Sequence, residues 1–178
     1  MVGILTSILL LGAIWTFLSR VREPSFRQPG PPPNPKEGFA APDFTLDLLD
    51  GGQLTLSELR GHPVVLNLWA SWCLPCRSEM PSIEQAYQDY KDAGLIVIGL
   101  NVTSQDSESD ARAFVQEFGL TFPIVLDRDG SVQSRYLLLG LPSTYFIDQT
   151  GTIRSVIVGG PMSEATIQSN IQDVLQEK

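Results

Sequence analysis

The sequence predicts an α/β fold in which a central mixed sheet is flanked by helices. Apolar runs that are typical of buried strands alternate with stretches whose apolar residues recur at helical spacing. The run at residues 63–69 is apolar on both faces, as expected for a central strand that is covered by helices on either side. Residues 143–148 and 152–158 are two further strand-like segments joined by a tight turn, so this pair is expected to be antiparallel.

The segment before the central strand has the pattern of a hairpin. Residues 44–46 and 53–56 are short and apolar, and an Asp-Gly-Gly turn signal at 50–52 separates them. After the central strand, the spacing of apolar residues predicts a helix over 73–93. Because a proline ring clashes with the preceding turn of a helix, we expect a kink at Pro81.

The second half of the chain continues the alternation. Residues 95–102 read as a second buried strand, and a serine N-cap begins a helix over 107–118. A short strand at 122–126 and a short helix at 131–138 follow. An amphipathic helix at 163–176 closes the fold.

The chain has two cysteines, and they lie directly after the central strand. Cys73 and Cys76 form a Cys-x-x-Cys pattern where a helix is expected to begin, so the first sulfur meets the unpaired amides and positive dipole end of that helix. Such a position lowers the pKa of a thiol, and the thiolate is the attacking species in disulfide exchange. We therefore predict a redox centre in which Cys73 is the nucleophile and Cys76 the resolving partner.

A zinc site and a purely structural disulfide are the alternatives for this pair. Zinc would need two more ligands, whereas the sequence has no third cysteine and one histidine, His62, in a turn-like segment. A disulfide across so short a loop removes little entropy from the unfolded chain. We expect no metal and no cofactor other than the redox-active Cys73–Cys76 disulfide itself.

The first 38 residues differ in composition from the rest. Residues 2–18 are almost continuously apolar, and about 17 residues is the lower end of what spans a bilayer as a helix. A secretory signal peptide is the alternative, although no small-residue cleavage pattern follows. We expect a membrane anchor at 1–19 in the lipid bilayer, a stiff Pro-rich linker at 20–38 and a folded domain at 39–178.

Charge bears on topology and on partners. Arg20, Arg22 and Arg27 follow the apolar run, so the positive-inside bias alone would keep the domain in the cytoplasm. A tethered dithiol domain is most useful on the oxidising side, and basic residues upstream of Met1 would restore the usual bias. We therefore expect a single-pass protein of the bacterial cell membrane with its domain on the extracytoplasmic side. The domain has eight basic and eighteen acidic side chains, which disfavours nucleic acid as a partner.

Four motifs resemble those of one family. They lie at residues 41–46, 59–73, 76–81 and 141–148, and the likeness covers nearly everything from Phe39 onward. They look like the membrane-anchored thioredoxin-like thiol-disulfide oxidoreductases of the TlpA, ResA and CcmG (DsbE) type. The resemblance implies a thioredoxin-like fold with an N-terminal hairpin extension, a helical insertion between about residues 103 and 133, and one N-terminal transmembrane helix.

The resemblance also implies roles for individual residues. Cys73 would be the exposed nucleophile and Cys76 the resolving cysteine, in agreement with their placement. Pro142 corresponds to the family's cis-proline, beside which the backbone of Leu141 would pair with an incoming chain. Glu79 resembles the acidic residue that the family buries beneath its cysteines, where a carboxylate of raised pKa can accept a proton from Cys76. A solvated glutamate on the helix surface is the alternative.

Residues next to the cysteines complete the expected site. Trp72 is expected to be more exposed than Trp69, and we expect Trp72, Leu74 and Pro75 to contact the substrate. Thioredoxin itself has a buried aspartate where this chain has Asn67. We therefore expect Glu79, on the helix that follows the cysteines, to be the residue that handles the proton.

Reduction of disulfides in extracytoplasmic proteins is the leading functional hypothesis. The resemblance implies apocytochrome c as a client during cytochrome c maturation, and a membrane reductant of the thiol-transfer type. A peroxiredoxin-like peroxide reductase is a second hypothesis, but Ala70 stands where that class has threonine and Leu66 where it has proline. A third is a redox-linked binding or chaperone module whose dithiol only signals.

Overall fold

The structure, a computed structural model, describes residues 32–176, so the predicted anchor at 1–19 lies outside the described residues. Within this range, no helix is long and apolar enough to cross a membrane. The strands are β1 (Thr45–Leu48), β2 (Gln53–Thr55), β3 (Val64–Trp69), β4 (Ile96–Asn101), β5 (Ile124–Leu126), β6 (Ser143–Ile147) and β7 (Ile153–Val158). The helices are α2 (Leu74–Tyr90), α3 (Glu108–Phe118), α4 (Ser131–Arg135) and α5 (Glu164–Gln176), with 3₁₀ turns η1 (Leu56–Leu59), η2 (Lys91–Ala93) and η3 (Thr103–Gln105).

These strands form one mixed sheet in the order β2-β1-β5-β4-β3-β6-β7. β3 pairs in parallel with β4 and antiparallel with β6, which places the strand that leads to the cysteines near the middle of the sheet. Every residue of β3 is buried, as expected for a strand that is covered on both faces. The predicted antiparallel pair at the end of the chain is confirmed as β6 and β7.

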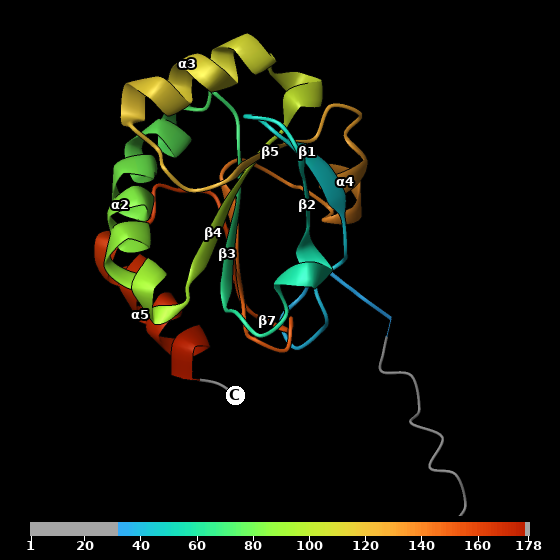
Figure 1. The fold of residues 1–178 in the computed structure, drawn as a ribbon, viewed down its shortest axis with the longest axis vertical. Helices are drawn as coiled ribbons and strands as arrows, with labels where there is room; N and C mark the ends of the chain where they lie inside the picture. The colour runs from blue at the N-terminus through green and yellow to red at the C-terminus, as the bar shows by residue number, and fades with distance from the viewer. Residues whose placement is uncertain (1–31, 177–178) are drawn as a thin grey trace, which may run out of the picture. The chain divides into compact units, whose positions relative to one another are not determined.

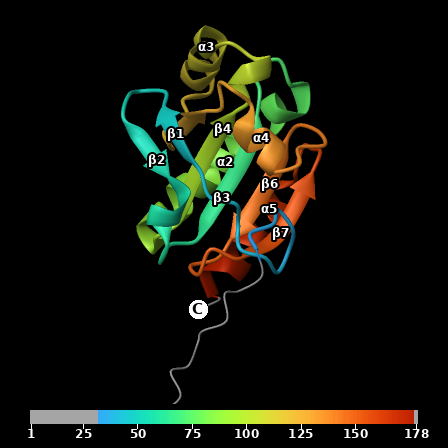
Figure 2. The same ribbon diagram turned by 90° about the vertical axis from the view of Figure 1, so that its right-hand side faces the viewer.

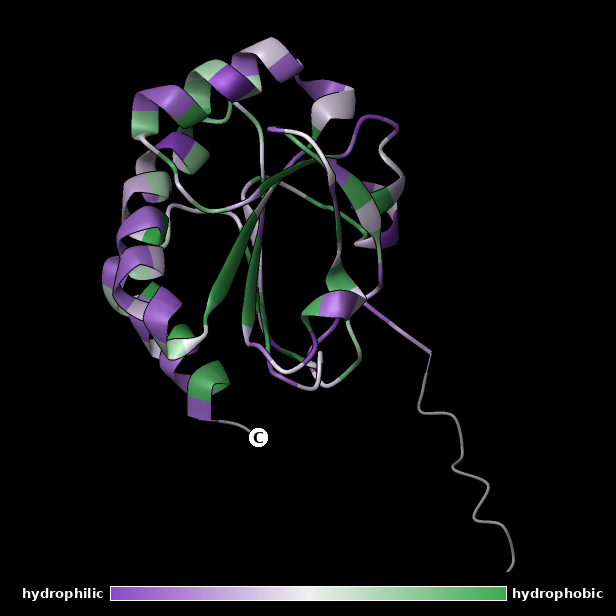
Figure 3. Ribbon diagram, in the orientation of Figure 1, coloured by the Kyte–Doolittle hydropathy of each residue, from purple (hydrophilic) through white to green (hydrophobic). Residues whose placement is uncertain are grey.

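Helices cover the two faces of the sheet unequally. α2 and α5 lie side by side on one face together with α3, whereas α4 lies on the other (Figures 1 and 2). β3 and β4 are mainly apolar, whereas the helices contain both apolar and polar residues (Figure 3). Two cores result, one on each face. The first includes Trp69, Met80, Ile83, Phe114 and Phe146, and the second Leu66, Leu68, Ile98, Tyr136 and Tyr145.

The helix that was predicted over 73–93 is divided into two elements. Cys73 is the N-cap of α2, which continues through Pro81 and ends at Tyr90. η2 follows, and Gly94 ends it with φ at 94°, in the left-handed region that glycine adopts without steric cost.

The predicted helical insertion also contains a strand of the sheet. Besides η3 and α3, it supplies β5, which pairs in parallel with β4 and antiparallel with β1. The insertion therefore joins the N-terminal hairpin to the rest of the sheet.

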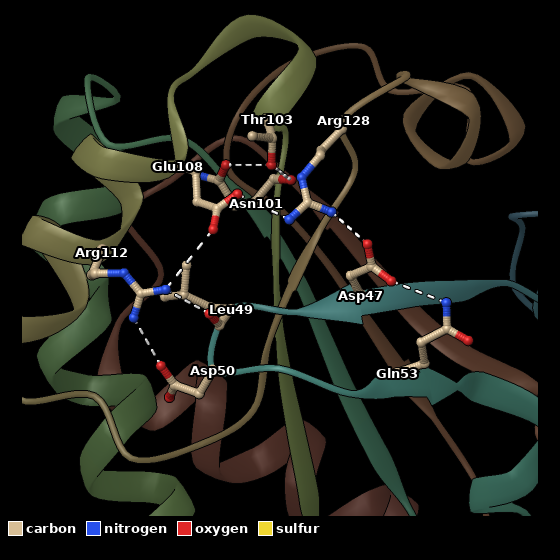
Figure 4. Close-up of polar contacts among 9 residues, drawn as sticks. All are labelled: Asp47, Leu49, Asp50, Gln53, Asn101, Thr103, Glu108, Arg112 and Arg128. Carbon is tan, nitrogen blue, oxygen red and sulfur yellow. Dashed lines mark hydrogen bonds and ion pairs between the residues drawn. The ribbon is translucent and has the colours of Figure 1, made fainter.

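A network of charged side chains connects this insertion to the hairpin (Figure 4). Arg128 forms ion pairs with Asp47 of β1 (2.6 Å) and with Glu108 of α3 (2.9 Å). Arg112 of α3 pairs with Asp50 in the hairpin turn (3.0 Å). The insertion and the β1–β2 hairpin, which both depart from the plain thioredoxin pattern, thus contact each other.

The last residues of the predicted linker are part of the fold. Gly38 and Phe39 exchange backbone hydrogen bonds with Ile153 of β7 (2.8 and 2.9 Å), and the carboxylate of Glu37 accepts one from the N–H of Val156 (3.1 Å). Residues 37 and 38 of the predicted linker are therefore hydrogen-bonded to β7, while residues 20–31 lie outside the described residues. The segment pairs with β7 because that strand lies at the edge of the sheet and has unpaired backbone groups to offer.

Candidate active site

The two cysteines form a disulfide at the N-terminus of α2. Their Cα atoms lie 5.2 Å apart, and the backbone N–H of Cys76 donates a hydrogen bond to the sulfur of Cys73 (3.2 Å). In the reduced protein the same N–H and the positive end of the helix would stabilise a thiolate at Cys73. The local geometry therefore favours Cys73 over Cys76 as the nucleophile.

Burial distinguishes the two sulfurs in the same way. Cys73 retains 4% of its surface, whereas Cys76 retains none. The prediction of an exposed nucleophile is thus only partly right, because neighbouring side chains cover most of Cys73. The remaining surface opens into a hollow of about 440 Å³, which we call the dithiol groove. It is lined by Trp72, Cys73, Leu74, Pro75, Gln105, Leu138, Leu139, Gly140 and Leu141.

The predicted difference between the two tryptophans is confirmed. Trp72 is 56% exposed at the rim of the dithiol groove, and its indole N–H donates to the carbonyl oxygen of Gln105 (2.9 Å). Trp69 is fully buried and packs on Phe114 at 4.4 Å between ring centroids. Leu74 is 75% exposed on the same rim. The rim thus presents apolar surface next to the reactive sulfur.

The Leu141–Pro142 peptide bond is cis, as predicted. A second cis bond, at Gly160–Pro161, was not predicted. A Cβ atom at Gly160 would lie 2.8 Å from the ring of Pro142 and 2.8 Å from the carboxylate of Glu79. Glycine at this position therefore allows three parts of the site to pack closely.

Glu79 is buried, so the alternative of a solvated surface glutamate is wrong. Its carboxylate accepts hydrogen bonds from the side-chain amide of Asn67 (2.9 Å) and from the backbone N–H of Met162 (3.0 Å). Burial raises the pKa of Glu79 above its ordinary value, and these two hydrogen bonds offset part of that effect. A carboxyl group of raised pKa thus lies one helical turn after Cys76.

Asn67 occupies the central strand position next to this carboxyl group. Its amide N–H₂ donates to both Glu79 and Thr144 (2.9 Å each), while its buried Oδ1 has no hydrogen-bond partner among the described residues. Rotation of the amide would present Oδ1 to a protonated Glu79. Asn67 can therefore accommodate either protonation state of the carboxyl group.

Sequence reasoning missed Asp106, which fixes the loop before Cys73. Its carboxylate accepts from the N–H of Ser71 (2.7 Å), the hydroxyl of Ser71 (2.6 Å) and the amide of Asn101 (2.8 Å). Burial alone would raise the pKa of Asp106, but the hydrogen bonds from Ser71, Asn101 and Ser107 outweigh it and lower the pKa. A signal was present, because Asp106 and Ser71 follow neighbouring parallel strands whose carboxyl ends meet at one edge of the sheet.

Metal ligands do not gather in the described part of the chain. Between residues 32 and 176, no three His, Cys, Asp or Glu side chains lie close enough to hold a metal ion. His62 lies in the turn before β3, with a ring nitrogen 3.2 Å from the carbonyl oxygen of Gly94.

Comparison with known proteins agrees with this geometry. The model of the AhpC/TSA family matches residues 38–156. The chain belongs to the AhpC/TSA family. The thioredoxin-like protein YneN of Bacillus subtilis (strain 168) is 42% identical over 125 residues, which cover 70% of this chain and 72% of that protein. The thiol-disulfide oxidoreductase ResA of Geobacillus kaustophilus (strain HTA426) is 38% identical over 137 residues, 77% of each chain.

Solved structures show the same fold. A Chlorobium tepidum protein assigned as the thiol:disulfide interchange protein DsbE superposes with a TM-score of 0.73 at 31% identity, covering 79% of this chain and 98% of that one. A secreted Mycobacterium tuberculosis disulfide oxidoreductase homologous to E. coli DsbE gives a TM-score of 0.67 at 25% identity, with 73% and 95% coverage. This AhpC/TSA protein therefore has a thioredoxin-like fold and is a thiol-disulfide oxidoreductase, and its two cysteines form a disulfide with each other.

Proposed function

We propose that this AhpC/TSA protein acts as a reductase, whose dithiol form reduces disulfides of extracytoplasmic proteins. The observation that carries the proposal is the buried carboxyl group of Glu79, which lies one helical turn after the buried Cys76 in α2. Cys76 must lose a proton before it can attack, and a buried thiol does so only if a nearby base accepts that proton. Glu79, with its raised pKa, is suited to this step.

The reaction has two exchange steps. The Cys73 thiolate attacks one sulfur of the client disulfide, that S–S bond breaks, and the released client sulfur takes up a proton. Cys76 then passes its proton to Glu79 and attacks the Cys73 sulfur, which releases the second client sulfur as a thiolate. That thiolate takes up a proton from water, and Glu79 gives up its proton to water before the next cycle. Two electrons have moved from the protein to the client, and the protein is left in the disulfide form described above.

The dithiol groove is where the client would bind. Trp72, Leu74 and Pro75 would contact apolar parts of the client on one side of Cys73. On the other side, the backbone of Leu141 lies next to the cis-proline Pro142 and would pair with an extended client chain.

We further propose that residues 1–19 anchor the domain outside the bacterial cell membrane. The apolar composition of residues 2–18 supports the anchor. A membrane reductant of the thiol-transfer type would restore the dithiol, and apocytochrome c is the client that we propose. Support for the client comes from the likeness to ResA and to DsbE-type proteins.

Trapping of the mixed disulfide tests these roles. The full-length chain is reduced, freed of reductant and mixed with an oxidised peptide that contains the apocytochrome pattern Cys-x-x-Cys-His. We expect Cys76→Ser to accumulate a covalent adduct with the peptide and Cys73→Ser to form none. Adduct formation by Cys73→Ser alone would show that the roles are reversed.

A further inference from the structure

Exposed apolar side chains gather beside the active site. Of the described residues, those with large apolar side chains exposed to solvent are Trp72, Leu74, Leu137, Leu139 and Val158. All five line one of two adjoining hollows. Single exposed apolar side chains are ordinary on protein surfaces, but a group of them in one place marks an interaction surface.

The second hollow lies on the face of the sheet formed by β6 and β7, and we call it the β6–β7 hollow. It has a volume of about 450 Å³. Tyr145 is paired with Val156 and Ser143 with Val158, so these four side chains share one face and line the hollow. The chain that follows α4 and the turn at residues 35–37 line its sides, as the places of α4, β6, β7 and the N-terminal segment in Figure 2 indicate.

Three polar side chains around the β6–β7 hollow have hydrogen-bond partners, and Lys36 also lines the hollow. The hydroxyl of Tyr145 donates to the carbonyl oxygen of Tyr136 (3.0 Å), and that of Tyr136 donates to the carbonyl oxygen of Pro42 (2.8 Å). Glu37 accepts from the N–H of Val156 (3.1 Å). The hollow is therefore held in shape by its own hydrogen bonds, and what it offers to a ligand is mainly apolar surface.

The two hollows share one lining residue. Leu139 is 89% exposed and lines both of them. The same loop continues to Leu141, whose backbone would pair with the client. An extended chain that is bound beside Cys73 and continues past Leu139 reaches the β6–β7 hollow.

We propose that the β6–β7 hollow binds an apolar side chain of the same extended client chain whose disulfide reacts at Cys73. This inference rests on the proposed function, because it presupposes a polypeptide client in the dithiol groove. It adds a rule for which clients are selected. They are unfolded segments with an apolar residue at a set number of positions along the chain from the reacting cysteine. Burial of that side chain strengthens client binding and leaves the sulfur chemistry unchanged.

Peptide probes test the rule with the full-length chain in phospholipid nanodiscs, since detergent could fill an apolar hollow. Two series of synthetic peptides carry the same Cys-Ala-Ala-Cys disulfide. They differ in having leucine or serine at one position beyond it, over several spacer lengths. We expect leucine at one spacer length to raise the second-order rate of oxidation of the reduced protein about tenfold over serine, as partial burial of one aliphatic side chain would.

Variants of the hollow locate the effect. Val158→Thr and Leu137→Asn make the hollow polar with little change of shape, and asparagine tolerates the positive φ of 50° at position 137. Together they should abolish the leucine advantage and leave the rate with hydroxyethyl disulfide, a small substrate, unchanged. Val115→Thr on α3 makes the same chemical change outside both hollows and should keep the leucine advantage.

The measured rates separate failure of this inference from failure of the proposed function. Equal rates for leucine and serine at every spacer length would overturn the inference, and so would an equal slowing of hydroxyethyl disulfide by the variants. Equal rates are also the result expected if residues 20–31 or a second copy of the chain occupy the hollow. Failure of the reduced protein to reduce any of these disulfides would instead reject the proposed function.

Discussion

At residue 79 a carboxyl group is enclosed in the protein and held by one side-chain donor and one backbone donor. Its raised pKa means that folding favours the protonated form. The contribution of Glu79 to stability is therefore fully present below its ordinary pKa of 4.5 and is lost as pH rises through the folded-state value. The same property that suits Glu79 to accept a proton thus has a cost in stability at neutral pH.

Glu79→Gln tests this linkage in the oxidised protein. The glutamine carbonyl can accept from Met162, and its amide can donate to the unpaired Oδ1 of Asn67, so the variant is expected to fold. Urea unfolding over a pH series should show the wild-type chain losing stability relative to the variant as pH rises above 4.5. A stability difference that stays constant with pH would contradict the raised pKa.

Resolution of the mixed disulfide should depend on the same residue. Because Glu79 accepts the proton of Cys76 in our account, Glu79→Gln should slow the second exchange step and leave the first unchanged. Stopped-flow tryptophan fluorescence and acid-quenched gel analysis can separate the two steps. An unaltered pH profile for the second step would contradict the proton-accepting role.

Asp106 acts one step away from the sulfur, by holding Ser71 in place. In Asp106→Asn, an amide N–H₂ would face donors of Ser71 and Asn101, and two donors cannot hydrogen-bond to each other. We therefore expect a loss of about 1–3 kcal/mol in unfolding free energy. It should also change the pKa of Cys73, measured by the pH dependence of its alkylation. Asp110→Asn, an exposed change on α3, is the control, and equal behaviour of the two variants would refute a positioning role.

At the scale of elements, the hairpin and the insertion are joined by ion pairs that are half exposed. Arg128 lies between Asp47 and Glu108, with side-chain exposures of 43–48% for the three residues. Pairs of this kind are screened by water and salt. Their part in fixing the register of β1 against β5 is therefore expected to be larger than their part in overall stability.

Arg128→Met tests the strength of that connection. We expect only a small loss in unfolding free energy, and the loss should shrink in high salt. Urea titrations at low and high sodium chloride measure it. A large loss that does not respond to salt would mean that the arginine acts through packing instead.

The turn after β7 packs closely against Pro142 and Glu79 at Gly160. Gly160→Ala would place a methyl group 2.8 Å from Pro142 and from the Glu79 carboxylate. Overpacking of this kind should cost about 1–3 kcal/mol. Gly140→Ala is the matched control, since nothing lies within 4 Å of its Cβ position. Equal unfolding midpoints for the two variants would contradict the close approach.

Across the whole molecule, short-range patterns predicted most of the fold and the centre of the site. The placement of Cys73 and Cys76 after a buried strand can be read along the chain, whereas the roles of Glu79 and Pro142 were implied by the family resemblance. Asp106 was missed because it meets Ser71 across 35 residues, and no local pattern marks that contact. The place of β5 in the sheet was missed for the same reason, since a three-residue strand is defined by its partners on β1 and β4. The predicted anchor at 1–19 stays a prediction.

The direction of electron flow is the central claim, and the reduction potential of the Cys73–Cys76 pair tests it most directly. The full-length chain is equilibrated in dithiothreitol or glutathione buffers of known potential, and the dithiol fraction is measured after acid quenching. We predict a value well below about −180 mV, the potential of disulfide isomerases, as expected for a reductase. A value near about −120 mV, that of a strong oxidant, would mean that the protein introduces disulfides and would contradict the account.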